Sequence, residues 1–140
     1  MKEFHLGIGV FGHEMVILAF VSALVSAVAY GLASRSKIAT EQSDSWRKLA
    51  RIAFYVHSGA VLAIIGTLFT IIYNHYYEYH YAWSHSSNNL PTHFMISCFW
   101  EGQEGSFLLW IFWHVVIGLV LLRTAKMWES QVMFVFALVQ

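Results

Sequence analysis

The sequence predicts an all-α transmembrane fold, and three observations lead to that class. Of its 140 residues, 58% are apolar and only 11% are charged, whereas a soluble domain has about 25% charged residues. Three apolar runs are long enough to cross a bilayer, which takes about 20 helical residues. The lysines and arginines gather in two clusters beside these runs, as is typical of loops on the cytoplasmic side of a membrane.

The apolar runs give the expected spans in order. The first covers residues 13–34 and the second 52–76, and both exceed the length that a span needs. The third covers 105–122 once Gly105 and Ser106 are included. A fourth run, 131–140, is still apolar where the sequence stops, so we expect it to be the start of an incomplete span. We therefore expect residues 1–140 to be a single membrane-embedded segment, the N-terminal part of a larger multi-span protein.

The basic residues predict the orientation of these spans. Seven of the eight lie within residues 35–51 and 123–126, which places residues 35–51 and 123–129 in the cytoplasm. The N-terminus and the loop 77–105 are then outside, on the periplasmic face of the inner (cytoplasmic) membrane. A signal peptide is the alternative reading of the first run. Glu3, Glu14 and a single lysine at its start, together with the basic cluster that follows it, favour a span.

The segments that flank the second span differ in composition. Residues 35–50 are polar, and we expect little helix there, with Trp46 at the membrane interface. At the other end of the span, aromatic residues predict an interfacial belt. Its expected role is anchoring, and a stacking surface for a flat cofactor is an open alternative. The belt consists of Tyr73, Tyr76, Tyr77, Tyr79, Tyr81 and Trp83.

The outer loop contains no lysine or arginine. Asn89 and Pro91 predict a turn followed by the start of a helix. From residue 92 to 100 the apolar side chains fall on one face, which predicts a short helix in the plane of the interface. Gly102 and Gly105 then permit either a sharp bend or a close approach by another group.

Two motifs therefore stand in a fixed order on this loop. The first is His85-Ser-Ser-Asn-Asn-Leu-Pro91, and the second is Trp100-Glu-Gly-Gln-Glu-Gly-Ser-Phe-Leu-Leu-Trp110. This order resembles that of the cytochrome c-type biogenesis haem lyase family CcmF/NrfE, in which His-Ser-Asn-x-x-Leu-Pro precedes Trp-x-Gly-x-Glu-Gly-Ser-x-Leu-Leu-Trp. Gly12-His13, before the apolar stretch that begins near Ile17-Leu18-Ala19, also resembles the family's N-terminal start. The resemblance runs along nearly the whole chain but covers only the N-terminal part of a family member.

The resemblance implies a component of a membrane haem lyase, which handles haem and helps attach it to apocytochrome c on the periplasmic face. The implied partners are haem, apocytochrome c, other cytochrome c maturation proteins and the lipid bilayer, with no nucleic acid. Gln103 stands where the family usually has histidine. The family's tryptophan-rich haem motif and later histidines do not occur in this segment, so the implied haem ligands lie outside it.

The same resemblance implies that certain motif residues shape the outer face that meets haem, apocytochrome or a partner, by packing and positioning. No residue in the segment is a convincing acid, base or nucleophile, so no catalytic role is assigned. The implied outer-face residues are Asn89, Pro91, Trp100, Gly102, Glu104, Gly105 and Trp110.

The histidines support other hypotheses. His75, His80 and His85 recur at five-residue steps, which do not share a helix face, so we expect no metal site there. His57 and His114 lie about 9 Å and about 13 Å inward from the nearest basic residues at 1.5 Å per residue, and facing each other they would ligate a b-type haem. Hydrogen bonding of each to a neighbouring helix is the alternative. The chain would then be a small b-type haem electron-transfer subunit or, as a third reading, a cofactor-free structural subunit.

Overall fold

The computed structural model describes residues 5–35, 41–87 and 91–140. Within these ranges the regular structure is entirely helical, so the predicted all-α fold is confirmed. Three of the helices, α1, α2 and α5, are long and apolar enough to cross a membrane, and α6 is shorter. In chain order the helices are α1 (Leu6–Arg35), α2 (Glu41–Tyr73), α3 (His80–His85), α4 (Thr92–Cys98), α5 (Gln103–Thr124) and α6 (Glu129–Leu138).

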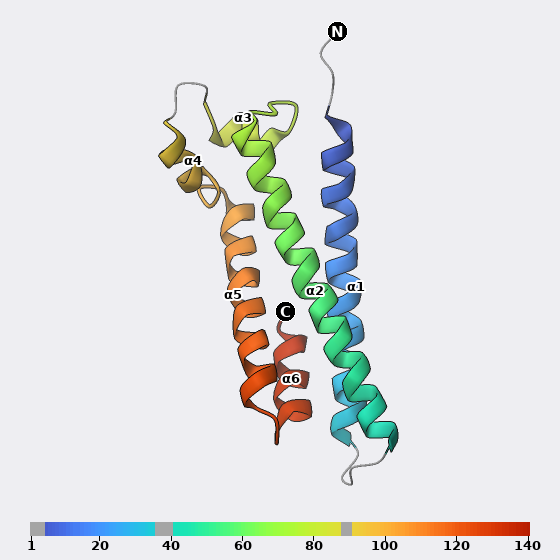
Figure 1. Ribbon diagram of the computed structural model, residues 1–140. Coiled ribbons are helices and arrows are strands. Elements are labelled where there is room, and N and C mark those ends of the chain that lie inside the picture. Colours follow the sequence, from blue (N-terminus) through green and yellow to red (C-terminus); the bar gives the residue numbers. More distant parts are fainter. Residues whose placement is uncertain (1–4, 36–40, 88–90) are drawn as a thin grey trace.

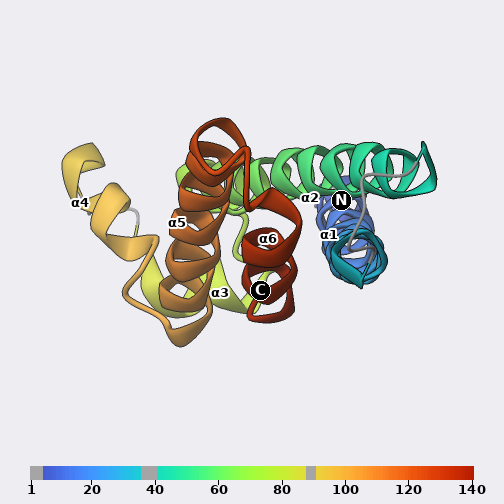
Figure 2. The same cartoon turned by 90° about the horizontal axis from the view of Figure 1, so that it is seen from below.

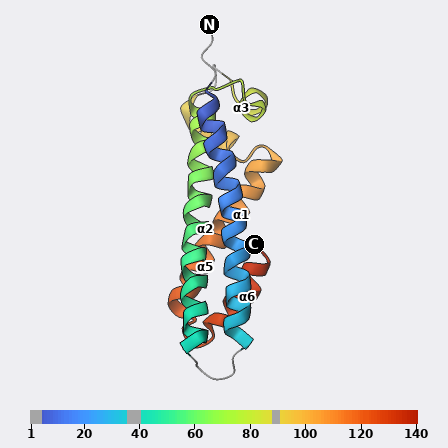
Figure 3. The ribbon, with the colours of Figure 1, turned by 90° about the vertical axis from the view of Figure 1, so that its right-hand side faces the viewer.

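The helices form an elongated bundle with two distinct ends (Figure 1). α1 and α2 lie side by side as an antiparallel pair over most of their length (Figure 3). α5 packs on α2, and α6 folds back between α5 and α1 (Figure 2). We call the end that carries α3 and α4 the loop end. The opposite end, with the α5–α6 turn and the basic residues Arg35, Arg123 and Lys126, is the basic end.

Small side chains bring α1 and α2 into close contact. Ala19, Ser22, Ser26, Ala29 and Ala33 recur three or four residues apart on one face of α1, and all are buried. Small residues let helix backbones approach closely in a membrane. The Ser26 hydroxyl crosses the interface and donates a hydrogen bond to the main-chain carbonyl of Ala50, at 3.1 Å. The pair is therefore held by backbone proximity and by polar groups that are satisfied between the helices.

Residues 41–50, which we expected to be poor in helix, form the first turns of α2. That expectation is wrong for these residues, and 36–40 lie outside the described residues. Glu41 and Asp44 occupy the first turn, where a helix N-terminus favours negative charge. Ser43 is buried against α1 and donates a hydrogen bond to the Ala33 carbonyl at 3.3 Å. Tertiary packing of this kind stabilises helices that composition alone does not predict.

The outer boundaries of the first two helices also differ from the prediction. α1 begins at Leu6 and has 30 residues, so it is longer than the predicted span 13–34. α2 ends at Tyr73 and not at 76, because His75 adopts a left-handed backbone conformation with φ of 54°. The amides of Tyr76 and His75 donate to the carbonyls of Ile71 and Ile72 at 3.1 and 3.2 Å. This is the Schellman pattern that ends a helix.

An ion pair joins three helices near the basic end. The carboxylate of Glu129, at the start of α6, is only 1% exposed. Arg51 of α2 donates to it twice, from Nε to Oε1 at 2.6 Å and from Nη2 to Oε2 at 2.5 Å. The Tyr30 hydroxyl of α1 donates to the same Oε1 at 3.2 Å. The start of α6 is therefore fixed against both α1 and α2.

We expect Glu129→Ala to lower the free energy of unfolding by about 2–3 kcal/mol, because it leaves a charged group and a buried hydroxyl without their partner. This loss of stability is smaller than the loss from breaking a fully buried ion pair, because the Arg51 side chain is 42% exposed. Asp44→Ala, which removes an exposed pair with Arg47, should cost only about 0–1 kcal/mol.

Denaturant unfolding in detergent micelles, followed by circular dichroism, measures both changes. The double variant Arg51→Met, Glu129→Met should lose less stability than Glu129→Ala, since it leaves no unpaired charge. Equal and small losses for Glu129→Ala and Asp44→Ala would show that the pair does not hold α6.

Candidate functional site

Tyr81, the second residue of α3, binds the turn that connects α4 to α5. Its hydroxyl donates a hydrogen bond to the Phe99 carbonyl at 2.8 Å and accepts one from the Gly102 amide at 3.2 Å. Burial raises the pKa of the Tyr81 hydroxyl, so the group stays protonated and remains a donor at neutral pH. One side chain therefore supplies a hydrogen-bond partner both to the residue that follows α4 and to the residue that precedes α5.

The two motif glycines are needed for this close approach. A Cβ on Gly102 would lie 2.6 Å from the Tyr81 ring, and a Cβ on Gly105 would lie 1.7 Å from the Phe99 carbonyl oxygen. Neither distance is compatible with a side chain. Of the two alternatives that the sequence allowed, a sharp bend or a close approach, the close approach is present at both positions.

The first motif meets the second at the same tyrosine. The His85 ring stacks on the Tyr81 ring with centroids 4.5 Å apart, and its Nδ1 lies 3.2 Å from the Tyr81 carbonyl oxygen. Pro91 directly precedes α4, as the sequence predicts. Asn89 lies outside the described residues. The sequence assigned Tyr81 to the aromatic belt, so its part in joining the motifs was missed.

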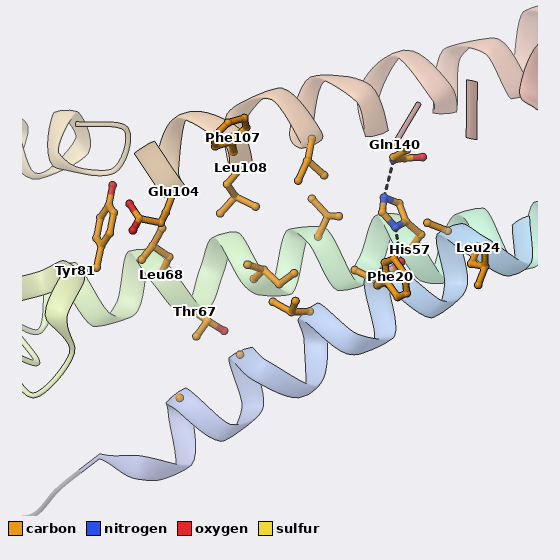
Figure 4. A pocket seen from close by; sticks show the side chains of 18 of the residues that line it. Phe20, Leu24, His57, Thr67, Leu68, Tyr81, Glu104, Phe107, Leu108 and Gln140 are labelled. Carbon is orange, nitrogen blue, oxygen red and sulfur yellow. Dashed lines mark hydrogen bonds between the residues drawn. The ribbon is translucent and has the colours of Figure 1, made fainter. Parts of the chain in front are cut away.

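The remaining motif residues face outward around this turn. Trp100 is 44% exposed, and Trp110, on the first half of α5, is 69% exposed. Glu104 is also exposed and lies in the first turn of α5, beside Tyr81 (Figure 4). The structure thus separates the motif into buried glycines that form the turn and outward side chains that are free to contact other groups.

An apolar groove of about 770 Å³ lies between α1 and α5, with α2 as its floor. Tyr79, Tyr81 and Glu104 border it at the loop end, and His57 and Gln140 lie toward its other end (Figure 4). Pockets of about 300–1,000 Å³ hold small ligands in many proteins. The described residues that line this groove include no lysine or arginine.

His57 is the buried polar side chain at the deep end of the groove. It is 4% exposed, and its Nδ1 lies 2.9 Å from the Ala19 carbonyl oxygen. Since a carbonyl only accepts, Nδ1 carries the hydrogen and Nε2 carries the lone pair. Gln140 Nε2 lies 2.6 Å from His57 Nε2 (Figure 4), while Gln140 Oε1 is buried without a partner in the described part of the chain. A fixed tautomer of this kind suits a hydrogen-bond acceptor or an iron ligand.

His114 lies in different surroundings. It is half-buried on α5 and stacks on Phe136 of α6, with centroids 4.5 Å apart. It does not line the groove into which His57 points. A haem in this groove would find an axial ligand in His57, but no basic side chain for its propionates among the lining residues. Ligation by His57 and His114 together stays a prediction.

Comparison of the chain with protein-family models, with curated proteins and with solved structures finds no match. The long helices and their apolar outer surfaces define a multi-pass membrane protein. Inferences about its function therefore depend on the groove and on the turn between α4 and α5, residues 99–102, which Tyr81 binds. We call this turn the Tyr81 turn.

We expect Gly105→Ala to destabilise the chain by about 1–3 kcal/mol, the usual cost of inserting a methyl group where there is no room. Gly59 is the matched control, because nothing lies within 4 Å of a Cβ built there. Gly59→Ala, within α2, should be neutral or stabilising by up to about 1 kcal/mol. Thermal unfolding in detergent compares the two, and equal effects would contradict the close approach at Gly105.

Proposed function

We propose that this chain is part of a membrane cytochrome c assembly protein, which handles haem and helps attach it to apocytochrome c on the periplasmic face of the inner membrane. The observation that supports it is the meeting of the two outer-loop motifs at Tyr81. His85 from the first motif and Gly102 from the second both contact this side chain. Because both motifs contact the same side chain, we infer that they form one surface, and not two separate points of attachment to the membrane interface.

The proposed orientation places the loop end outside. The basic residues of the α5–α6 turn and of the α1 terminus lie at the other end of the bundle, where the positive-inside rule places the cytoplasm. The N-terminus and the Tyr81 turn are then on the periplasmic side, where the apocytochrome is proposed to be met.

In this proposal the Tyr81 turn is a rigid platform with outward contact groups. Trp100 and Trp110 offer aromatic surface, and Glu104 offers a carboxylate. The described residues of the loop, 77–87 and 91–105, include no lysine or arginine, so haem propionates find no cation on it. The platform is therefore proposed as one wall of a haem-handling surface, and no haem ligand is assigned to it.

Trp100→Ala and Glu104→Ala in the full-length protein test the proposal without filling the space beneath Tyr81. We expect each to lower the amount of c-type cytochrome several-fold, because the contact groups are lost while the turn is kept. Haem-stained gels of membrane fractions measure this. Trp128→Ala, at a tryptophan that is 65% exposed near the basic end, is the matched control. Normal maturation in both test variants, with normal protein levels, would reject the proposal.

A second candidate, a b-type haem electron-transfer subunit, is favoured by the tautomer of His57. With Nδ1 bound to Ala19, the lone pair on Nε2 is the one that an iron would take. Gln140, which occupies this lone pair in the structure, would have to move away from it. Expression with added haem should then give a purified chain with a haem spectrum that is lost in His57→Ala. If His114→Ala leaves the spectrum unchanged, the proposed pair is replaced by His57 alone. A colourless wild-type protein would rule this candidate out.

A further inference from the structure

A cluster of contacts attaches the start of α1 to the connection between α2 and α3. The main-chain amide of His5 donates to Glu78 Oε1 at 3.1 Å, and its ring Nδ1 lies 3.0 Å from the same oxygen. The His5 ring stacks on Tyr76, with centroids 3.9 Å apart and planes 11° from parallel. The imidazole is therefore held in place both by a carboxylate and by an aromatic face.

Tyr79 forms the second part of this cluster. Its hydroxyl donates to the His5 carbonyl at 2.6 Å and accepts from the Gly9 amide at 3.0 Å. The first amides of a helix lack partners within the helix, so Tyr79 acts as a cap for α1. A Cβ on Gly9 would lie 2.6 Å from the Tyr79 hydroxyl, so glycine is needed for this contact. Gly9 and Tyr79 also line the apolar groove at its loop end.

We propose that these residues form a proton-sensitive latch, in which protonation of His5 tightens the attachment of α1 at the loop end of the groove and deprotonation loosens it. The proposal does not depend on haem or on the function proposed above. It rests on one ionisable ring that contacts a carboxylate, on the cap beside it, and on the position of both at the mouth of the groove.

The chemistry gives the direction of the effect. Against an ionised Glu78, a neutral His5 donates one hydrogen bond from Nδ1, and protonation of the ring adds the attraction between opposite charges. Hydrogen bonds from its own amide and from the amide of His5 hold the pKa of Glu78 below its usual range. Glu78 is therefore ionised near pH 6.5, which is about the pKa of an ordinary imidazole. Protonation of His5 therefore strengthens the latch, and its deprotonation weakens it.

The other ionisable groups near the connection have separate contacts. His75 stacks on Tyr77, and His80 lies against Trp83. Tyr76 contacts His5 through its ring and Tyr79 through its hydroxyl. Lys2 and Glu3 precede His5 and lie outside the described residues. Among the described residues of this connection, Glu78 is thus the charged side chain that contacts His5.

Amide hydrogen exchange of the 140-residue chain in lipid nanodiscs tests the latch. We compare residues 6–12 at about pH 5.5 and about pH 8, either side of the ordinary imidazole pKa of about 6.5, after correction for intrinsic exchange rates. Protection should be about two- to fivefold greater at the lower pH, the size of effect that a partly exposed ion pair produces. Residues of α5 serve as an internal reference, with no pH-dependent change expected.

Three variants separate the charge from the packing. His5→Phe keeps a ring for Tyr76 but removes the charge, and Glu78→Gln keeps an acceptor but removes the charge, so both should abolish the pH dependence. Tyr79→Phe should lower protection at both pH values and keep the dependence. The proposal is overturned if the wild type shows no pH dependence, or if the dependence persists in both His5→Phe and Glu78→Gln while α5 is unchanged.

Discussion

The placement of α6 depends on the buried carboxylate of Glu129. α6 has only ten residues, and after the polar residues of its first turn it is apolar on all sides, so hydrophobicity alone does not select the face that it presents to the bundle. A buried charge is costly unless it is paired, and Glu129 finds partners on both α1 and α2 through Tyr30 and Arg51. With its start fixed, α6 extends along the bundle until Gln140 reaches His57. The deep boundary of the groove thus follows from an ion pair at the other end of a short helix.

A different polar constraint fixes the loop end. Where α4 stops and α5 starts, backbone groups lose their helical partners, and buried groups must find others. The Tyr81 hydroxyl supplies them by bonding the Phe99 carbonyl and the Gly102 amide. Glycines at 102 and 105 admit the tyrosine and let the backbone approach closely. The two glycines are therefore needed because of one side chain, Tyr81, which lies about twenty residues earlier in the sequence.

The sequence predicted what depends on local composition and missed what depends on neighbours. Long apolar runs dictate membrane-length helices in any context, so the three spans were predictable. Residues 41–50 are polar, and they are helical because they pack against α1. Amino-acid composition alone does not predict such packing. Tyr81 lies among aromatic residues typical of an interface, and its partners are set by the path of α4. Depth estimates gave His57 and His114 comparable positions, but the rotation of each helix decides what a side chain faces, and α6 places Phe136 against His114.

The groove and the proposed outer platform share Tyr81 and Glu104, and this sets an electrostatic condition on the proposed function. Glu104 is exposed at the mouth of the groove, and the described groove lining contains no lysine or arginine to offset it. Haem propionates near this carboxylate would meet like charge, which is unfavourable, above all where water is scarce. A haem that approaches this face must therefore turn its propionates away from Glu104, toward cations on another segment or on a partner. The contribution of this platform to haem contact would then be aromatic, through Trp100 and Trp110, and the Glu104 carboxylate would serve contact with the apocytochrome or a partner. Charge complementarity to the propionates would come from the opposite side of the haem.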